Sequence, residues 1–286
     1  MLTELNRTSK LLDLSEDYFT ANATTEIGKI ISEFDRLGCV KLESAISDNC
    51  VLNIKNFLFS QLSKYEKIFE SFFGFSWRDS YSLSNRLVDK DFDFDGMPDD
   101  IKHLVRGELP LEVRTSPVLK EVCFEPRFVD VLEGLLGDTY LRMHSPPSVR
   151  ISQPNVSSSM VPLHQDATYF PHLQNFLTAW VPFTRIDNRC GGIEILSKSH
   201  KQEMLPILGS GIWHRSNLSY SQEEICPITC ELGDVVLFGP KLLHKSGANS
   251  SNRIRCSVDY RFFNHTQPSS KPYYDLHSHE VVWNGA

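Results

Sequence analysis

The sequence predicts a mostly β fold, an antiparallel barrel or sandwich with helices before it. From Tyr140 onward, short runs rich in β-branched and aromatic residues recur between turn residues, without helical patterns between them. These runs are YLRMH, SVRIS, FLTAWVPF, GIEILS, DVVLF and IRCSVDYRFF. Before Tyr140, apolar residues recur mainly at helical spacing. A chain of 286 residues is long enough to bury a sizeable core as one domain with elaborations.

The first elements are two helices with a short strand between them. Residues 25–37, TEIGKIISEFDRL, carry apolar residues at helical intervals, and Gly38 is a typical helix terminator. CVKLES then predicts a short strand. Residues 48–73 predict a longer amphipathic helix, with Asp48 as its N-cap.

Two further segments lack clean periodicity. Residues 74–117 predict a loop-rich elaboration, and the acidic run at 89–100 is most simply a solvated surface. The tail from about residue 265 is rich in Pro and Ser and is expected to wrap the surface. No internal repeat is evident.

Composition favours a small-molecule partner in the cytoplasm. The net charge is −7 and Lys and Arg are dispersed, which argues against binding to nucleic acid or anionic membranes. No apolar run approaches the roughly 18 residues that span a bilayer, and the N-terminus lacks the apolar region of a signal peptide. The seven scattered cysteines suit free thiols, and Cys226 and Cys230 lack a second pair to complete a zinc site.

The stretch VPLHQDATYF suggests part of a metal site. In a strand, alternate residues point to the same face, so His164 and Asp166 could both face the barrel interior and bind one ion. A second histidine would complete the two-His, one-carboxylate triad of non-haem Fe(II) oxygenases. The candidates for that ligand are His172, His200, His214, His244 and His265.

His244 stands out because of what surrounds it. It follows a Gly-Asp turn, the strand VVLF and a Gly-Pro bend, and Arg255 begins another strand eleven residues later. An arginine inside a barrel requires an anionic partner, because an unpaired buried guanidinium is very costly. A carboxylate of a small ligand, bound through two hydrogen bonds, would meet that need.

The order of PLHQDATYF, FLTAWVPF, CGGIEILSKSH and GDVVLF–LLHKSGANSSNRIR resembles the phytanoyl-CoA dioxygenase family. The resemblance covers about residues 140–262, with a weaker echo at FDRLGCVKLES. It implies an Fe(II)- and 2-oxoglutarate-dependent oxygenase on a double-stranded β-helix, a cupin-type jelly roll. The implied single domain has its core at about 140–262, helices and lid loops at about 1–139, and a tail at 263–286. One departure is SKSH at 197–200, where the family often has Pro-Gly-Ser-His.

Carried over residue by residue, the resemblance makes His164, Asp166 and His244 the iron ligands. It makes Arg255 the partner of the distal carboxylate of 2-oxoglutarate, with Arg253 as the runner-up.

The resemblance also places further residues near the two small molecules. The 2-oxoglutarate pocket would include Thr178, Trp180 and Gln153. The fold tends to build its substrate cover from the irregular segment before the barrel, where the candidate contacts are Trp77, Arg78, Tyr81 and Arg86.

The implied function is hydroxylation of an unactivated C–H bond of a small metabolite, with Fe(II), 2-oxoglutarate and O2. The presence of Asp166 argues against halogenation but leaves desaturation and ring closure open. A natural-product or other specialised substrate is preferred to an acyl-CoA, since no basic patch for CoA is evident. The alternatives are a cupin enzyme that does not use 2-oxoglutarate and a non-catalytic metal-binding jelly roll. The sequence leaves the substrate and the oligomeric state open.

Overall fold

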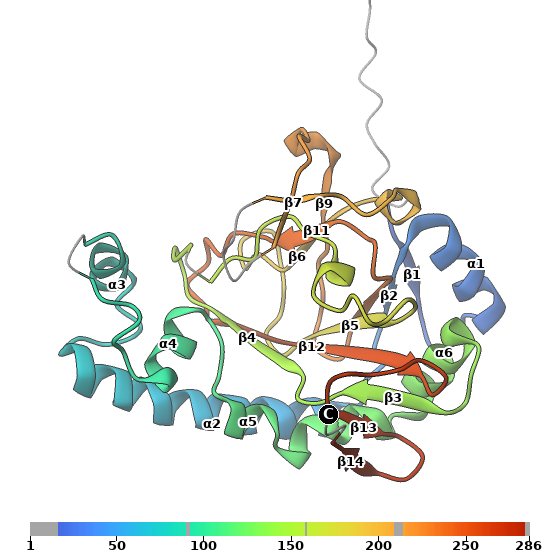
Figure 1. Cartoon of the computed structure of the whole chain (residues 1–286), viewed down its shortest axis with the longest axis horizontal. Coiled ribbons are helices and arrows are strands. Elements are labelled where there is room, and N and C mark those ends of the chain that lie inside the picture. Colours follow the sequence, from blue (N-terminus) through green and yellow to red (C-terminus); the bar gives the residue numbers. More distant parts are fainter. Residues whose placement is uncertain (1–16, 90–91, 158, 209–213, 284–286) are drawn as a thin grey trace, which may run out of the picture.

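The predicted barrel is built from a large and a small β-sheet, seen in the computed structural model in Figure 1. The model describes residues 17–89, 92–157, 159–208 and 214–283. The large sheet has the order β1-β2-β10-β5-β12-β3-β13-β14, and β4 also pairs with β12. Its strands are β1 (Phe19–Ala21), β2 (Cys39–Leu42), β3 (Leu141–His144), β4 (Ser148–Ser152), β5 (Leu177–Pro182), β10 (Val235–Phe238), β12 (Arg255–Asn264), β13 (Tyr273–Asp275) and β14 (Glu280–Val282).

The small sheet has the order β11-β6-β9, and a separate pair is formed by β7 and β8. These strands are β6 (Ile193–Leu196), β7 (Ile207–Leu208), β8 (Arg215–Ser216), β9 (Ile225–Pro227) and β11 (His244–Ser246). The chain crosses from the large sheet to the small one between β5 and β6, and again between β10 and β11. The mostly β jelly-roll prediction is therefore confirmed, and each of the six predicted runs contains a strand.

The two long N-terminal helices lie where the sequence predicts them. Helix α1 (Ile27–Leu37) ends at Gly38, whose φ of 81° is easily reached by glycine. Helix α2 (Asp48–Phe73) has the predicted bounds, but the side chain that accepts the N–H of Cys50 is that of Ser47, one residue before the helix. Ser47 is therefore the N-cap, and the prediction of Asp48 was wrong.

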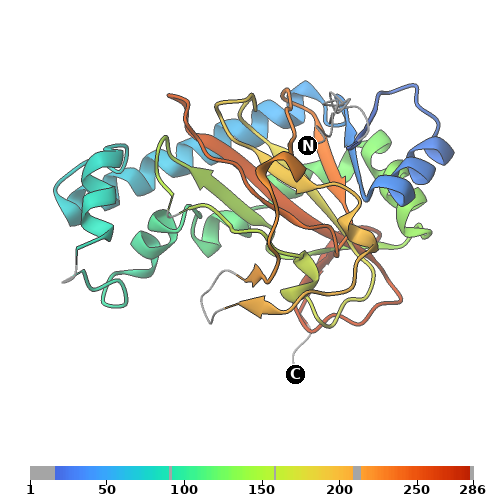
Figure 2. The ribbon, with the colours of Figure 1, turned by 90° about the horizontal axis from the view of Figure 1, so that it is seen from above.

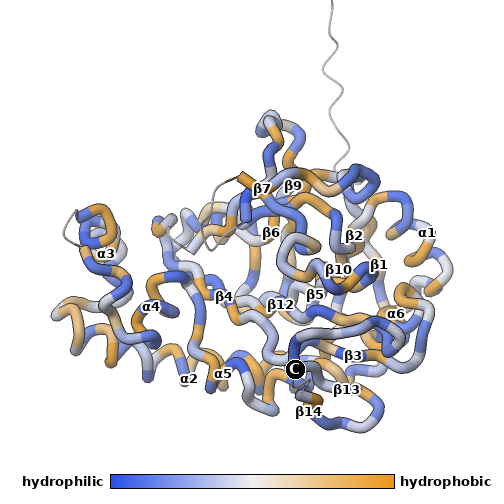
Figure 3. Tube along the Cα trace, in the orientation of Figure 1, coloured by the Kyte–Doolittle hydropathy of each residue, from blue (hydrophilic) through white to orange (hydrophobic). Residues whose placement is uncertain are grey.

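Helix α2 runs along the large sheet (Figures 1 and 2). Hydrophobic and hydrophilic positions interleave along it (Figure 3), as expected of a helix with one buried face. Its residues Ile54, Leu58 and Leu62 belong to the same apolar cluster as Val258 of β12. Burial of this face thus joins the helix to the apolar core of the large sheet.

The segment 74–117 is more helical than predicted. It forms α3 (Ser80–Leu87), α4 (Asp99–Val105) and α5 (Leu111–Arg114), and the 3-10 helix η2 (Pro117–Phe124) and α6 (Pro126–Leu136) follow. Each of the first three helices is too short for an apolar period to be visible, and each buries only one to three side chains. Residues 92–100 of the acidic run are largely solvent-accessible, as predicted, while 90 and 91 lie outside the described residues.

The sheet extends on both sides of the expected 140–262 core. On one side β2 pairs with β10, and on the other β13 of the tail pairs with β3. The tail is thus partly a sheet edge rather than only a surface wrap. The first 16 residues, on which the signal-peptide prediction largely rests, and residues 284–286 lie outside the described part. Within that part, no helix has the length and apolar character to cross a membrane. All seven cysteines are buried free thiols.

Candidate metal centre

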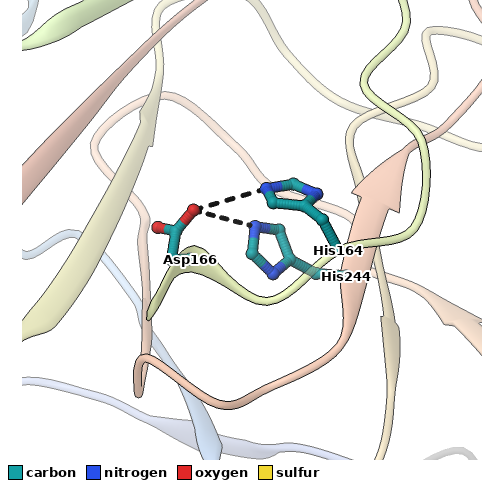
Figure 4. Close-up of side chains that lie close together, drawn as sticks. All are labelled: His164, Asp166 and His244. Atoms are coloured by element: carbon teal, nitrogen blue, oxygen red, sulfur yellow. Dashed lines mark ion pairs between the residues drawn. The ribbon is translucent and has the colours of Figure 1, made fainter. Parts of the chain in front are cut away.

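The side chains of His164, Asp166 and His244 converge at one point inside the barrel (Figure 4). Oδ1 of Asp166 lies 3.3 Å from Nε2 of His164 and 3.7 Å from Nε2 of His244. Ligands at right angles around one metal, with bonds of about 2.1 Å, would be about 3 Å apart. All three side chains are buried, and they form the cluster of potential metal ligands found among the described residues. The donor set and its spacing fit a divalent metal such as iron.

The two histidines come from segments that meet in a β-bridge, His244 from β11 and His164 from a loop, whereas Asp166 comes from a turn. His164 and His244 face each other in an antiparallel bridge, and the backbone N–H of each donates to the carbonyl of the other. After Gln165 the chain turns, and Asp166 begins the short 3-10 helix η3 (Asp166–Thr168). The expected i, i+2 placement along one strand is therefore wrong in detail. The side chain of Gln165 holds the turn by donating to the carbonyl of Lys241, 2.9 Å away.

Hydrogen bonds to the backbone orient both imidazoles. Nδ1 of His164 donates to the carbonyl of Pro162 at 2.8 Å, and Nδ1 of His244 donates to that of Leu242 at 2.9 Å. With Nδ1 protonated, Nε2 carries the lone pair that a metal needs. Burial, reinforced by the neighbouring His164, lowers the pKa of His244 to about 3, so this ring is neutral near pH 7.

Asp166 is held as a carboxylate. Burial alone would raise its pKa, but the guanidinium of Arg261 and the nearby histidines outweigh burial and keep the pKa well below its usual range. Nε of Arg261 donates to Oδ2 at 3.1 Å, and Nη2 donates to Oδ1 at 3.2 Å. The hydroxyl of Thr178 also donates to Oδ2, at 2.6 Å.

The three side chains line a cavity of about 300 Å³, together with Arg255 and Trp180. Arg255 is only 3% exposed. Its Nη1 lies 3.5 Å from the carbonyl of Gly191, and its Nε has no hydrogen-bond partner among the described residues. A buried cation without an anion beside it is rare in proteins, because its desolvation is uncompensated. Arg255 is therefore prepared for an anion that enters the cavity.

The other residues predicted around 2-oxoglutarate are divided between two places. Thr178 and Trp180, both on β5, line the cavity of the metal site. Gln153 lines a separate cavity, and so does Arg253, whose guanidinium lies 2.6 Å from the carboxylate of Asp187. The structure thus brings Arg255, and not Arg253, to the metal site.

The four candidate substrate contacts do not reach this cavity in the described part of the chain. Trp77 is buried in the core, and its indole N–H donates to the carbonyl of Leu104. Arg78 pairs with Glu66 and Arg86 pairs with Asp89. Tyr81 is 78% exposed. Packing of α3 and α4 on α2 directs these side chains elsewhere.

Several residues that line the cavity were missed by the sequence reasoning. Arg261 lies on β12, on the same face as Arg255, because the two are separated by an even number of residues. That parity was a usable signal. Tyr169 and Lys271 also line the cavity, as does Arg150, which pairs with Glu108 and Asp259. Glu108 and Lys271 come from segments read as irregular, which gave no signal.

Comparison with known proteins places this site in a family. The family model described as "Phytanoyl-CoA dioxygenase (PhyH)" matches residues 52–257. A probable phytanoyl-CoA dioxygenase of Caenorhabditis elegans is 29% identical over 161 residues, 52% of each chain. A 1-deoxypentalenic acid 11-beta-hydroxylase of Streptomyces arenae is 30% identical over 168 residues, 54% of each chain. The match thus spans about half the length of these curated relatives.

Among solved structures, the epimerase SnoN in complex with Fe3+, alpha ketoglutarate and nogalamycin RO superposes with a TM-score of 0.55. It is 16% identical, and the match covers 91% of each chain, which shows a shared fold. The family model covers most of the chain, including the three converging side chains and Arg255. The chain belongs to the phytanoyl-CoA dioxygenase family.

Proposed function

We propose that this protein is an Fe(II)- and 2-oxoglutarate-dependent oxygenase that hydroxylates a C–H bond of a small molecule. The observation that carries the proposal is the buried guanidinium of Arg255, which forms no ion pair within the described part of the chain and lines the same cavity as His164, Asp166 and His244. A metal site alone would serve many functions. A metal site joined to an unpaired buried arginine suits a co-substrate with a metal-binding end and a distal carboxylate.

His164, Asp166 and His244 would hold the iron, and Arg255 would bind the distal carboxylate of 2-oxoglutarate. The bound iron and co-substrate would supply the O2-dependent oxidation, while the protein orients the reactants and excludes water. Trp180 stays a predicted wall of the co-substrate pocket. The hydroxyl of Thr178 is engaged by Asp166, which supports a role toward the metal ligand rather than toward 2-oxoglutarate.

The substrate we favour is a small specialised metabolite. A cavity of about 300 Å³ is at the lower end of the range of ligand pockets, roughly 300–1,000 Å³. After 2-oxoglutarate enters, little enclosed space is left, so an acyl-CoA would have to leave its nucleotide outside. The Streptomyces relative is named for a hydroxylation of 1-deoxypentalenic acid, and SnoN was solved with nogalamycin RO. Buried free thiols favour a reducing compartment such as the cytoplasm.

The two alternatives from other classes explain less. A purely structural metal site tends to close its coordination with protein ligands, but this site offers three side chains and borders a cavity of about 300 Å³. A metal enzyme that does not use 2-oxoglutarate would leave Arg255 without a partner.

The proposal is tested by adding Fe(II) and 2-oxoglutarate to the purified protein without oxygen and recording the visible spectrum. A weak charge-transfer band is expected in the wild type. It should be absent in His164→Ala and should require far more 2-oxoglutarate in Arg255→Ala. Arg253→Ala, in a surface ion pair nearby in sequence, is the matched control and should resemble the wild type. A wild-type protein that binds iron but gives no band on adding 2-oxoglutarate would contradict the proposal.

A further inference from the structure

The two oxygens of Asp166 have different surroundings. Oδ1 is the oxygen that faces Nε2 of both histidines, at 3.3 and 3.7 Å. Oδ2 receives the hydroxyl of Thr178 at 2.6 Å and Nε of Arg261 at 3.1 Å. Nη2 of Arg261 lies near both oxygens, 3.2 Å from Oδ1 and 3.1 Å from Oδ2. Most of the donor contacts therefore fall on Oδ2, while Oδ1 faces the two imidazoles.

These donors sit on a rigid support. Arg261 of β12 and Thr178 of β5 are directly opposite each other in the antiparallel ladder. Arg261 is 8% exposed, its guanidinium lies over the ring of Phe170 at 4.8 Å, and its Nη1 is 3.4 Å from the hydroxyl of Ser148. Neighbouring strands thus hold both donors beside the turn that carries Asp166. We call Arg261 and Thr178 the carboxylate clamp.

A carboxylate can bind a metal through one oxygen or through both. An octahedral metal with two imidazoles and one carboxylate oxygen keeps three positions for other ligands. If the second oxygen also bound, only two would be left. A keto acid that chelates through two atoms, with O2 beside it, needs all three. Contacts that keep Oδ2 away from the metal would therefore preserve a coordination position that the reaction needs.

We propose that Arg261 and Thr178 are positioning residues, which restrict Asp166 to one metal-binding oxygen and so keep a coordination position open. This inference rests on the proposed function, because it assigns the freed position to 2-oxoglutarate and O2. It predicts that losing a clamp donor impairs binding of 2-oxoglutarate more than binding of Fe(II). If the clamp only stabilised the barrel, its loss would weaken binding of Fe(II) and of 2-oxoglutarate to the same degree, or would change neither.

The test measures two constants without oxygen: the dissociation constant of Fe(II) alone, and the 2-oxoglutarate concentration that gives half of the charge-transfer band. Thr178→Val removes the donor at nearly constant volume, and Thr178→Ser keeps it. Arg261→Met removes the two hydrogen bonds of the guanidinium group, and Arg261→Lys keeps the positive charge without that pair of hydrogen bonds. Arg253→Met, which breaks a surface Arg–Asp pair, is the matched control.

In Thr178→Val we expect a several-fold higher 2-oxoglutarate requirement, and in Arg261→Met about 10- to 100-fold. Removing a partner of a metal ligand typically costs that much in metal affinity or activity, and the clamp assigns the loss to binding of 2-oxoglutarate. Fe(II) binding in both should stay within about threefold of wild type, since the released oxygen can also ligate. Thr178→Ser and Arg253→Met should match the wild type, and Arg261→Lys should lie in between.

Two results would overturn the clamp while leaving the proposed function intact. In the first, the wild type gives a normal charge-transfer band, and neither the Fe(II) constant nor the 2-oxoglutarate constant differs between Thr178→Val and Thr178→Ser. The other is a parallel loss of Fe(II) and 2-oxoglutarate binding in the same variants. The Thr178 pair decides the question even if Arg261→Met does not fold. Absence of the band from the wild type itself would instead count against the proposed function.

Discussion

The two ends of β12 carry the same buried residue type in opposite situations. Arg255 and Arg261 point to the same face of the strand, line the same cavity and are almost fully buried. Arg261 forks onto the carboxylate of Asp166, whereas Arg255 has only a carbonyl at 3.5 Å. An internal anion completes the first site, and the second lacks one. The difference indicates that Arg261 stabilises a carboxylate of the protein itself, whereas Arg255 is available to an anionic ligand.

The pKa values of the two guanidinium groups shift in opposite directions. Burial lowers the pKa of Arg255, and the opposing effect of the Asp259 carboxylate does not outweigh it. Burial also opposes the charge of Arg261, but the Asp166 carboxylate outweighs it and raises that pKa. Removing each cation should therefore have opposite consequences for the protein without ligands.

The largest effect is expected for stability at the Arg261 end. Arg261→Met leaves Asp166 as a buried charge without its counterion, so the free energy of unfolding of the metal-free protein should fall by about 3–5 kcal/mol. Arg255→Met removes an unpaired buried cation and should leave stability unchanged or slightly higher. Urea unfolding of the two variants measures this directly. Equal losses in both would remove the distinction between the two arginines.

The next effect is expected in ligand binding at the Arg255 end. A charge-assisted hydrogen bond contributes about 1.5–3 kcal/mol, so Arg255→Met should raise the dissociation constant of 2-oxoglutarate roughly 10- to 100-fold. Fe(II) binding should be unaffected, because Arg255 makes no hydrogen bond to the three metal-binding side chains. Calorimetric titration under argon provides both constants. An unchanged 2-oxoglutarate constant would show that Arg255 is not the anchor.

A smaller effect is expected in the pH dependence of stability. Burial, together with the charge of Arg261, lowers the pKa of His144 from 6.5 to about 3. In the unfolded chain this histidine takes up a proton below about pH 6.5, but the folded protein cannot, so it contributes a loss of stability as pH falls from 6.5 toward 3. The slope is at most about 1.4 kcal/mol per pH unit.

His144→Phe should reduce that slope while keeping the aromatic packing against Phe170 and Phe263. His277→Phe, at an exposed position, is the control. Unfolding curves at several pH values compare the two. Equal slopes in His144→Phe and the wild type would show that His144 does not supply this dependence.

The smallest effect is expected for the exposed arginine next to β12. Arg253→Met breaks an ion pair with Asp187 whose two side chains are 38% and 43% exposed. Such pairs contribute about 0–1 kcal/mol. A larger change in unfolding free energy would mean that the surroundings of Arg253, rather than its pairing, set its contribution.

The sequence predicted that His164, Asp166, His244 and Arg255 would lie at one site, because spacing along the chain carries that information. His164 and Asp166 are close in sequence, and His244 and Arg255 share one strand-turn-strand segment. The role of Thr178 could not be predicted, since it depends on the register that places it opposite Arg261. The substrate contacts could not be predicted either, because Trp77 and Arg78 are directed by packing of short helices that have no visible period. Local sequence patterns therefore identified the candidate site residues, whereas the strand register determines which side chains hold them in position.

The most direct test of the account is a crystal structure grown without oxygen in the presence of Fe(II) and 2-oxoglutarate. We expect one oxygen of Asp166 to bind the iron and the other oxygen to accept hydrogen bonds from Arg261 and Thr178. We also expect Arg255 to bind the distal carboxylate of 2-oxoglutarate. A structure in which both Asp166 oxygens bind the iron, or in which Arg255 still faces no anion while 2-oxoglutarate is bound, would contradict it.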